Sequence, residues 1–117
     1  PDAALAQLRD VGAALGRGVR DCEDTRREWQ GQVFTAGDFL AIWAVENVVH
    51  HLDLLSGVAA PEGALRLARG TVEELAGAPL PAAWSDADAV LAGAGRTTPQ
   101  SADDVDDAAV ARLPVLG

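Results

Sequence analysis

The stretch 36–55, AGDFLAIWAVENVVHHLDLL, constrains the fold of this chain more than any other part of it. Its spacing predicts one long helix, with Thr35 placed as the N-cap and Asp38 three residues later, where a capping-box partner belongs. The Ser-Gly pair at 56–57 predicts its end. This helix is apolar nearly all round, which is typical of a helix in the centre of a bundle.

Four ionisable residues interrupt the later half of this apolar helix: Glu46, His50, His51 and Asp53. Successive residues of a helix are about 100° apart, so Glu46, His50 and Asp53 share one face, while His51 points elsewhere, beside Asn47. In a central helix we expect Glu46 to be buried. A lone buried carboxylate costs several kcal/mol, and a helix dipole offers no compensation at mid-helix.

Three partners could compensate Glu46: an arginine from another helix, a hydrogen bond with His50, or a metal ion. A carboxylate and an imidazole four residues apart can converge on one cation, as bundle metal sites require. The spacing alone supplies only two ligands, so by itself it favours a structural Glu–His pair, satisfied by an arginine or by water, over a metal site. Asp53 either orients His50 or contacts an arginine. His51 is an alternative ligand, or it serves a neighbouring interface or a water-bridged contact.

The rest of the chain also predicts helices, and we expect one all-α domain over 1–117. A first helix from Ala3 to about Glu28 carries an apolar stripe with three- and four-residue steps. Gly31 breaks this helix, and Trp29, Val33 and Phe34 indicate a short extended connector or one arm of a hairpin, without a convincing strand pair. Three further helices are expected. The first starts near Glu62, the second runs over about residues 82–91, and the third begins at a capping box of Ser101 and Asp104 and continues towards residue 113.

Composition excludes two classes of partner. The net charge of −9 argues against nucleic acid and against an anionic membrane surface. No apolar run reaches the roughly 18 residues that cross a bilayer. The single Cys22 continues the first helix's apolar stripe, so we expect it to pack as a small hydrophobe, in a reducing compartment. Arg96 is expected to be an exposed loop arginine rather than a contact for an anionic substrate.

At ENVVHHLDL, residues 46–54, the chain resembles the mycothiol-dependent maleylpyruvate isomerase family of the DinB-like metalloprotein superfamily. That family has a Glu, a His four residues on, often a second His, and then xDL on its last bundle helix. The similarity continues in style through LRLARGTVEELAGAPLPAAW and the closing ARLPVLG. It implies a DinB-like four-helix bundle whose later helices are present here, with short C-terminal helices.

The resemblance also implies a metal site. The family holds a divalent ion, usually zinc, with an early His and the Glu and His of the late helix, which correspond to Glu46 and His50. The only histidines here are His50 and His51, so the early ligand and its helix pair are missing. We expect those helices before Pro1, with a separate chain or a second copy in a homodimer as alternatives.

The function implied by the resemblance is metal-assisted thiol addition in the bacterial cytoplasm. Mycothiol would be the cosubstrate and an electrophilic small molecule the substrate, in an isomerase or thiol transferase reaction. The alternative is a non-catalytic helical interaction domain with an incomplete metal site.

Overall fold

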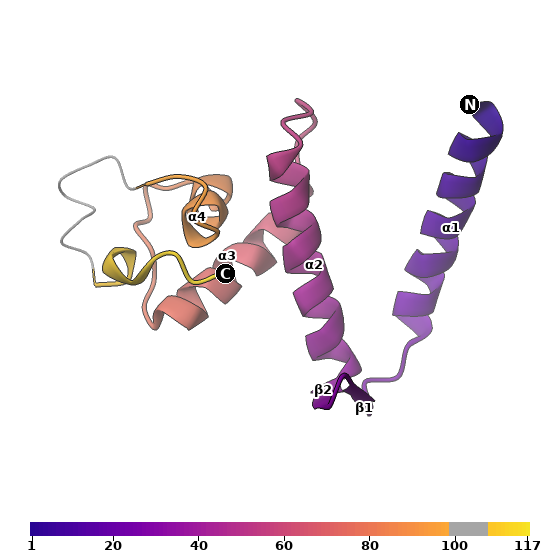
Figure 1. Cartoon of the computed structure of the whole chain (residues 1–117), viewed down its shortest axis with the longest axis horizontal. Helices are drawn as coiled ribbons and strands as arrows, with labels where there is room; N and C mark the ends of the chain where they lie inside the picture. Colours follow the sequence, from indigo (N-terminus) through magenta and orange to yellow (C-terminus); the bar gives the residue numbers. More distant parts are fainter. Residues whose placement is uncertain (99–107) are drawn as a thin grey trace. The chain divides into compact units, whose positions relative to one another are not determined.

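The computed structural model describes residues 1–98 and 108–117, and its contacts divide the chain into two units, 1–40 and 41–117. The first unit holds helix α1 (Asp2–Asp21), strands β1 (Arg26–Trp29) and β2 (Gln32–Thr35), and the start of helix α2 (Ala36–Asp53). The second holds the rest of α2, helices α3 (Glu62–Ala76) and α4 (Asp86–Gly93), and the 3-10 turn η1 (Val110–Arg112) (Figure 1).

Helix α1 forms as the three- and four-residue spacing predicts, but it buries none of its residues. Its apolar stripe is exposed along its whole length, at Leu5, Leu8, Val11, Leu15 and Val19. An isolated helix of this length is only marginally stable in water, because most helical stability in proteins comes from packing an apolar face.

A β-hairpin follows α1, and it corrects two predictions. The first helix ends at Asp21 rather than near Glu28, and β1 pairs antiparallel with β2, with Trp29 opposite Gln32. The two loop residues, Gln30 and Gly31, both have positive φ, as in a type I′ turn, whose twist matches that of paired strands. The chain is therefore mostly helical, as predicted, with one small two-stranded antiparallel sheet among the described residues.

Helix α2 begins where its sequence predicts. The amide of Asp38 donates to Thr35 Oγ1 at 3.1 Å, which confirms Thr35 as the cap. The neighbouring amide of Gly37 donates to Asp24 Oδ1 at 2.8 Å, so a second side chain, from the strand connection, satisfies this helix end. The helix ends at Asp53, two residues earlier than predicted, and Leu55 follows in a left-handed conformation.

The core of the second unit lies between α2, α3 and α4. Val45, Val48 and Val49 of α2 pack with Ala68 of α3 and Val90 of α4. A second cluster joins α3 and α4 to the C-terminal segment, through Val72, Ala76, Leu80, Ala89, Ala109 and Val110. The spacing of the apolar residues of α3 predicts a stripe of Leu65, Ala68, Val72 and Leu75. The contacts confirm Ala68 and Val72 on it, whereas Leu75, at 56% exposure, lies outside the core.

In the C-terminal third of the chain, the boundaries of the helices differ from those predicted. Ser85 caps α4 by accepting from the amide of Asp88 at 3.1 Å, so that helix begins at Asp86 rather than near Ala82. The predicted capping box of Ser101 and Asp104 lies outside the described residues. The described end of the helix predicted up to residue 113 is only the short turn η1.

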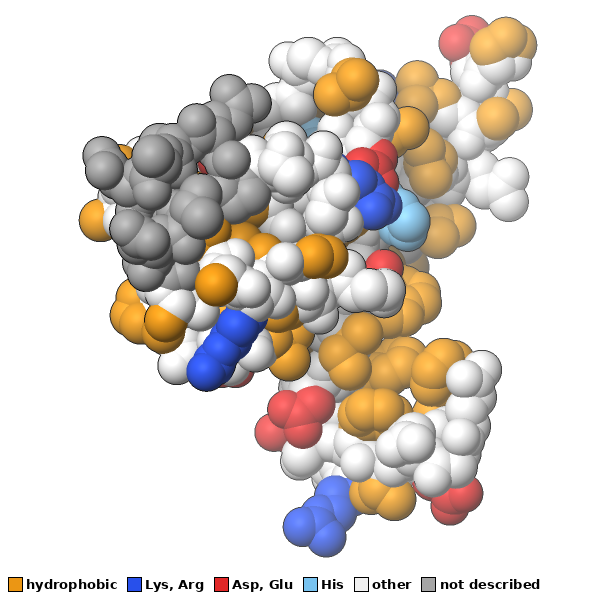
Figure 2. Space-filling view, turned by 60° about the vertical axis from the view of Figure 1, so that its left-hand side comes forward, with side chains coloured by type: hydrophobic (Ala, Val, Ile, Leu, Met, Phe, Trp, Pro, Cys, Tyr) orange, Lys and Arg blue, Asp and Glu red, His pale blue; other side chains and the backbone are white. Residues whose placement is uncertain are grey.

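Within the parts of the chain that the structure describes, no helix has both the length and the hydropathy needed to cross a bilayer. Hydrophobic side chains nevertheless reach the surface next to charged ones (Figure 2). Several of them belong to α1 and α2, so both helices keep apolar area in contact with solvent.

Candidate functional site

Glu46 and His50 lie one turn apart, near the middle of the part of α2 that belongs to the second unit. Glu46 Oε2 is 4.0 Å from His50 Nε2, and their side chains are 64% and 73% exposed. The helix spacing therefore brings the two predicted ligands together, as expected for residues four apart. Both side chains present their polar atoms to solvent.

The predicted burial of Glu46 is wrong. Helix α2 is apolar nearly all round, but it buries only the side that carries Val45, Val48 and Val49. Nearer the start of the helix, Ile42 is 46% exposed although it lies at nearly the same angle as Val49, and Trp43 is 51% exposed. We call Ile42, Trp43, Glu46 and His50 the Glu46 face of α2. An exposed carboxylate is stabilised by water, so the physical need for a compensating partner disappears in the isolated chain.

Asp53 contacts an arginine, which was one of its two predicted roles. Arg96 donates from Nε to Asp53 Oδ1 and from Nη2 to Asp53 Oδ2, both at 3.0 Å, and from Nη1 to the Ala94 carbonyl at 2.9 Å. This forked geometry is the strong form of an arginine–carboxylate pair. It ties the end of α2 to the loop after α4, where Arg96 is an exposed loop arginine, as predicted.

The Arg96 hydrogen bond lowers the pKa of Asp53, against the opposing effect of partial burial, and the charge on His50 adds to the lowering. The pKa of Asp53 is lower in the folded chain than in the unfolded chain, where it is near 3.9. The pair with Arg96 therefore stabilises the fold at pH values above about 3.9. This contribution is lost as the pH falls through the folded-state pKa. Stability should therefore decrease on acidification below about pH 4.

We expect Arg96→Gln to raise the pKa of Asp53 towards its ordinary value, because it removes the hydrogen bond and the charge that lower it. A titration of the Asp53 carboxyl carbon by NMR measures this shift. Arg66→Gln, which alters a separate ion pair with Glu62 on α3, is the control and should leave the Asp53 titration unchanged. An Asp53 pKa that does not move in Arg96→Gln would show that the pair does not form in solution.

His51 takes no part in the Glu46 face, as its angle on the helix predicts. Its Nε2 lies 2.8 Å from the carbonyl oxygen of Val58, in the loop that follows α2. This contact stabilises the loop that leads from α2 to α3. The contact engages one of the two imidazole nitrogens and leaves Nδ1 as the ring nitrogen that could bind a metal ion, as in metal-binding histidines whose other N–H donates to a backbone carbonyl.

The donor set on the Glu46 face suits a divalent cation but is incomplete. A carboxylate oxygen and an imidazole nitrogen are both ligands that zinc accepts, and zinc sites have at least three protein ligands. Among the residues that the structure describes, no three His, Cys, Asp or Glu side chains form a group that could hold an ion. Glu46 and His50 thus bring two donor atoms close together among the described residues.

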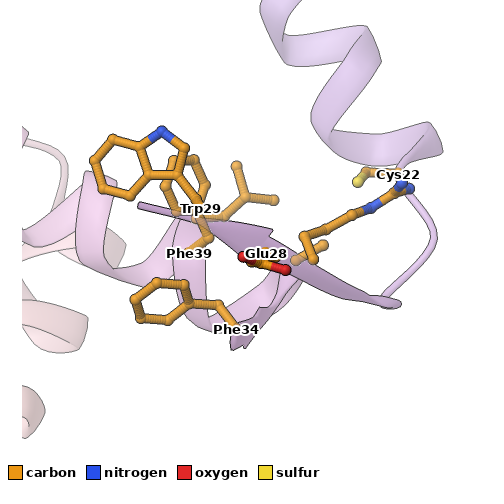
Figure 3. A pocket seen from close by; sticks show the side chains of 8 residues that line it. Cys22, Glu28, Trp29, Phe34 and Phe39 are labelled. Carbon is orange, nitrogen blue, oxygen red and sulfur yellow. The ribbon is translucent and has the colours of Figure 1, made fainter. Parts of the chain in front are cut away.

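A pocket of about 280 Å³ lies in the first unit, between the hairpin and the start of α2 (Figure 3). Trp29 and Phe39 meet edge to face with ring centroids 5.6 Å apart, and Phe34 lies 6.4 Å from Phe39. Cys22 borders the same pocket, and it is exposed rather than packed in α1, contrary to prediction.

These pocket residues were not predicted to lie together, because no convincing strand pair was expected. The available signal was Gly31, a turn residue with Trp29 on one side and Val33 and Phe34 on the other. The pocket is largely apolar, with Arg27 and Glu28 as its charged lining residues.

Comparisons of the chain with models of protein families, with curated proteins and with solved structures give no match.

Proposed function

We propose that this chain is a metal-dependent, mycothiol-using isomerase or thiol transferase of the maleylpyruvate isomerase type, with Glu46 and His50 as ligands of a divalent ion, zinc above all. The observation that carries the proposal is the 4.0 Å approach of Glu46 Oε2 to His50 Nε2 on an exposed helix face. From the resemblance at residues 46–54 we also propose a DinB-like bundle fold and a location in the bacterial cytoplasm.

A divalent ion at this face would supply one kind of chemistry, a lowered pKa for a thiol that then attacks an electrophilic carbon. The chain's own residues do the positioning. Glu46 presents a carboxylate and His50 an imidazole from the same side of a helix whose opposite side is anchored in the core by Val45, Val48 and Val49. Arg96 holds Asp53 at the next turn, so Asp53 takes the role of a neighbouring charge rather than of a ligand.

We expect the purified chain to bind zinc or nickel, and Glu46→Gln and His50→Ala each to abolish this uptake, because each removes one of two donors. Elemental analysis of the desalted protein measures the bound metal. Both side chains are exposed, so these variants should change the free energy of unfolding by no more than about 0.5 kcal/mol. Glu62→Gln alters another exposed helix carboxylate and should leave metal uptake unchanged.

Activity is tested with the metal-loaded chain, mycothiol and maleylpyruvate, by following isomerisation in the ultraviolet absorbance. The expected result is turnover that requires both thiol and metal and that is lost in Glu46→Gln. Wild-type protein without bound metal, or metal uptake that survives both variants, would contradict the assignment of Glu46 and His50.

A second candidate function is a non-catalytic helical interaction domain. Two observations favour it. The apolar stripe of α1 is exposed, and no three metal-binding side chains are grouped together among the described residues. This function predicts that the chain binds no stoichiometric metal. It also predicts that Leu8→Glu, which places a charge on the α1 stripe, weakens association with a partner.

A further inference from the structure

We propose that the pocket of the first unit binds a small carboxylic acid with an apolar body, which lies against the rings of Trp29, Phe34 and Phe39 while its carboxylate pairs with Arg27. All the lining residues fall within 22–40, in the connection after α1, in the hairpin and at the start of α2. The pocket shares no residue with the Glu46 face, so this inference does not depend on the proposed metal chemistry.

Aromatic side chains form the apolar wall of the pocket. The whole chain has three tryptophans, two phenylalanines and no tyrosine, and one tryptophan and both phenylalanines line this pocket. The centroid of the Phe39 ring lies 5.6 Å from that of Trp29 and 6.4 Å from that of Phe34. Trp29 is 52% exposed, so apolar ring area remains that a ligand can cover. An aromatic wall with few polar groups is typical of small-molecule sites.

Arg27 places a cation beside this aromatic wall. Side chains alternate along a strand, so Arg27 and Trp29 share one side of the hairpin, and the register sets Arg27 directly opposite Phe34. Glu28, the other charged lining residue, belongs to the alternate side and pairs with Val33. Among the described residues, no carboxylate forms an ion pair with Arg27. Its guanidinium is therefore available to the carboxylate of a ligand, in the forked geometry that this pair favours.

The start of α2 indicates a carboxylate rather than a phosphate as the acidic group. Phosphate binds at helix N-termini through backbone N–H groups that have no other partner. Here the amide of Gly37 donates to Asp24 Oδ1 and the amide of Asp38 donates to Thr35 Oγ1, so neither is available to a phosphate. A carboxylate needs only the two parallel hydrogen bonds that one arginine provides.

The volume of the pocket limits the size of the ligand. At about 280 Å³, it lies just below the range of about 300–1,000 Å³ that is usual for ligand sites. We therefore choose 3-phenylpropionate, with one ring and a short acidic chain, as the probe. Its amide, 3-phenylpropionamide, has the same apolar body without the charge. Comparing the two separates the contribution of Arg27 from that of the aromatic wall.

The test is an NMR titration of the full chain with 3-phenylpropionate, with its amide and with phenyl phosphate. The indole N–H signal of Trp29 should shift and reach saturation, whereas the signals of Trp43 and Trp84, which lie outside residues 22–40, should not move. The acid should bind about 10–100-fold more tightly than the amide, because hydrogen bonds between charged groups contribute about that factor. Phenyl phosphate should bind more weakly than the acid.

Arg27→Gln removes the cation and keeps the aromatic wall. It should weaken binding of the acid about 10–100-fold and leave binding of the amide unchanged. Arg26→Gln is the matched control, because Arg26 is the neighbouring arginine of the same strand but lies on the alternate side, opposite Thr35. This variant should bind the acid as the wild-type chain does.

Cys22 provides a second, independent measurement. It is the single cysteine of the chain, it is exposed, and it borders the pocket. In Figure 3 the three rings lie on one side of the view and Cys22 on the other, with Glu28 between them. Saturating 3-phenylpropionate should slow the alkylation of Cys22 by iodoacetamide. At the same concentration it should not do so in Arg27→Gln.

Three results would overturn the inference. The first is a Trp29 signal that shows no saturable shift with 3-phenylpropionate in the millimolar range. The second is equal affinity for the acid and the amide, or an Arg27→Gln variant that binds the acid as the wild-type chain does, since either result leaves a pocket that selects only apolar groups. The third is tighter binding of phenyl phosphate than of the acid, which would indicate a phosphate site.

Discussion

Arg69→Ala is expected to destabilise the second unit by at least about 3 kcal/mol. Arg69 Nε donates to Glu73 Oε1 at 3.0 Å, and Nη1 donates to the Trp84 carbonyl at 2.8 Å and to Asp86 Oδ1 at 3.3 Å. Nη2 donates to the carbonyls of Leu80 and Pro81. One guanidinium thus holds the whole turn from α3 to α4, with only 16% of its side chain exposed.

The size of this loss of stability follows from the polar groups that lose a hydrogen-bond partner when the Arg69 side chain is removed. The carbonyls of Leu80 and Trp84 lose the Arg69 donor, whereas the Pro81 carbonyl still accepts from the amide of Trp84 at 3.1 Å. A buried acceptor left unsatisfied costs about 1–3 kcal/mol. Glu73 also loses its cation, although its Oε1 still accepts from the amide of Leu80 at 3.1 Å. Arg69→Lys should rescue little, because an ammonium lacks the planar fork that reaches several acceptors.

Urea unfolding followed by circular dichroism measures this loss. Arg66→Ala is the matched control on the same helix: its ion pair with Glu62, at 3.5 Å, is largely exposed and worth no more than about 0.5 kcal/mol. If Arg69→Ala and Arg66→Ala unfold at similar urea concentrations, the Arg69 contacts do not stabilise the turn.

Gly93→Ala is expected to destabilise the fold by about 1–3 kcal/mol through overpacking, although alanine is the better helix former. A Cβ on Gly93 would lie 2.5 Å from Val72 Cγ2 and 2.8 Å from Val72 Cγ1. Val72 is fully buried in α3, and a β-branched side chain has little rotamer freedom with which to move away. Helices α3 and α4 would have to separate.

A separation at Gly93 would also disturb the C-terminal segment, because the Gly93 carbonyl accepts from the amides of Val115 and Leu116, both at 2.9 Å. Gly70→Ala in α3 is the control. A Cβ there meets no atom within 4 Å, so this change should stabilise the helix by about 0.5–1 kcal/mol. Thermal unfolding of the two variants should therefore shift in opposite directions, and equal shifts would show that the close approach of α3 and α4 is absent.

Much of the local structure was predictable because its causes are local. Thr35 caps α2 where its position indicates, and α3 presents Ala68 and Val72 to the core because a helix has a fixed angular period. The close approach of Glu46 and His50 follows from the same period. The hairpin was missed because its pairing depends on the positive φ angles at Gln30 and Gly31, which the surrounding stretch did not make evident.

The sequence by itself determined that α2 is a long helix and that Glu46 and His50 share one of its faces, since helix geometry depends only on residues a few positions apart. Only the tertiary structure decided which side of that apolar helix is buried, because burial depends on partners distant along the chain. Val90 and Ala94, more than 40 residues after Val45, cover one side, and Glu46 is left in water. Tertiary structure likewise paired Asp53 with Arg96, a contact that spacing cannot specify.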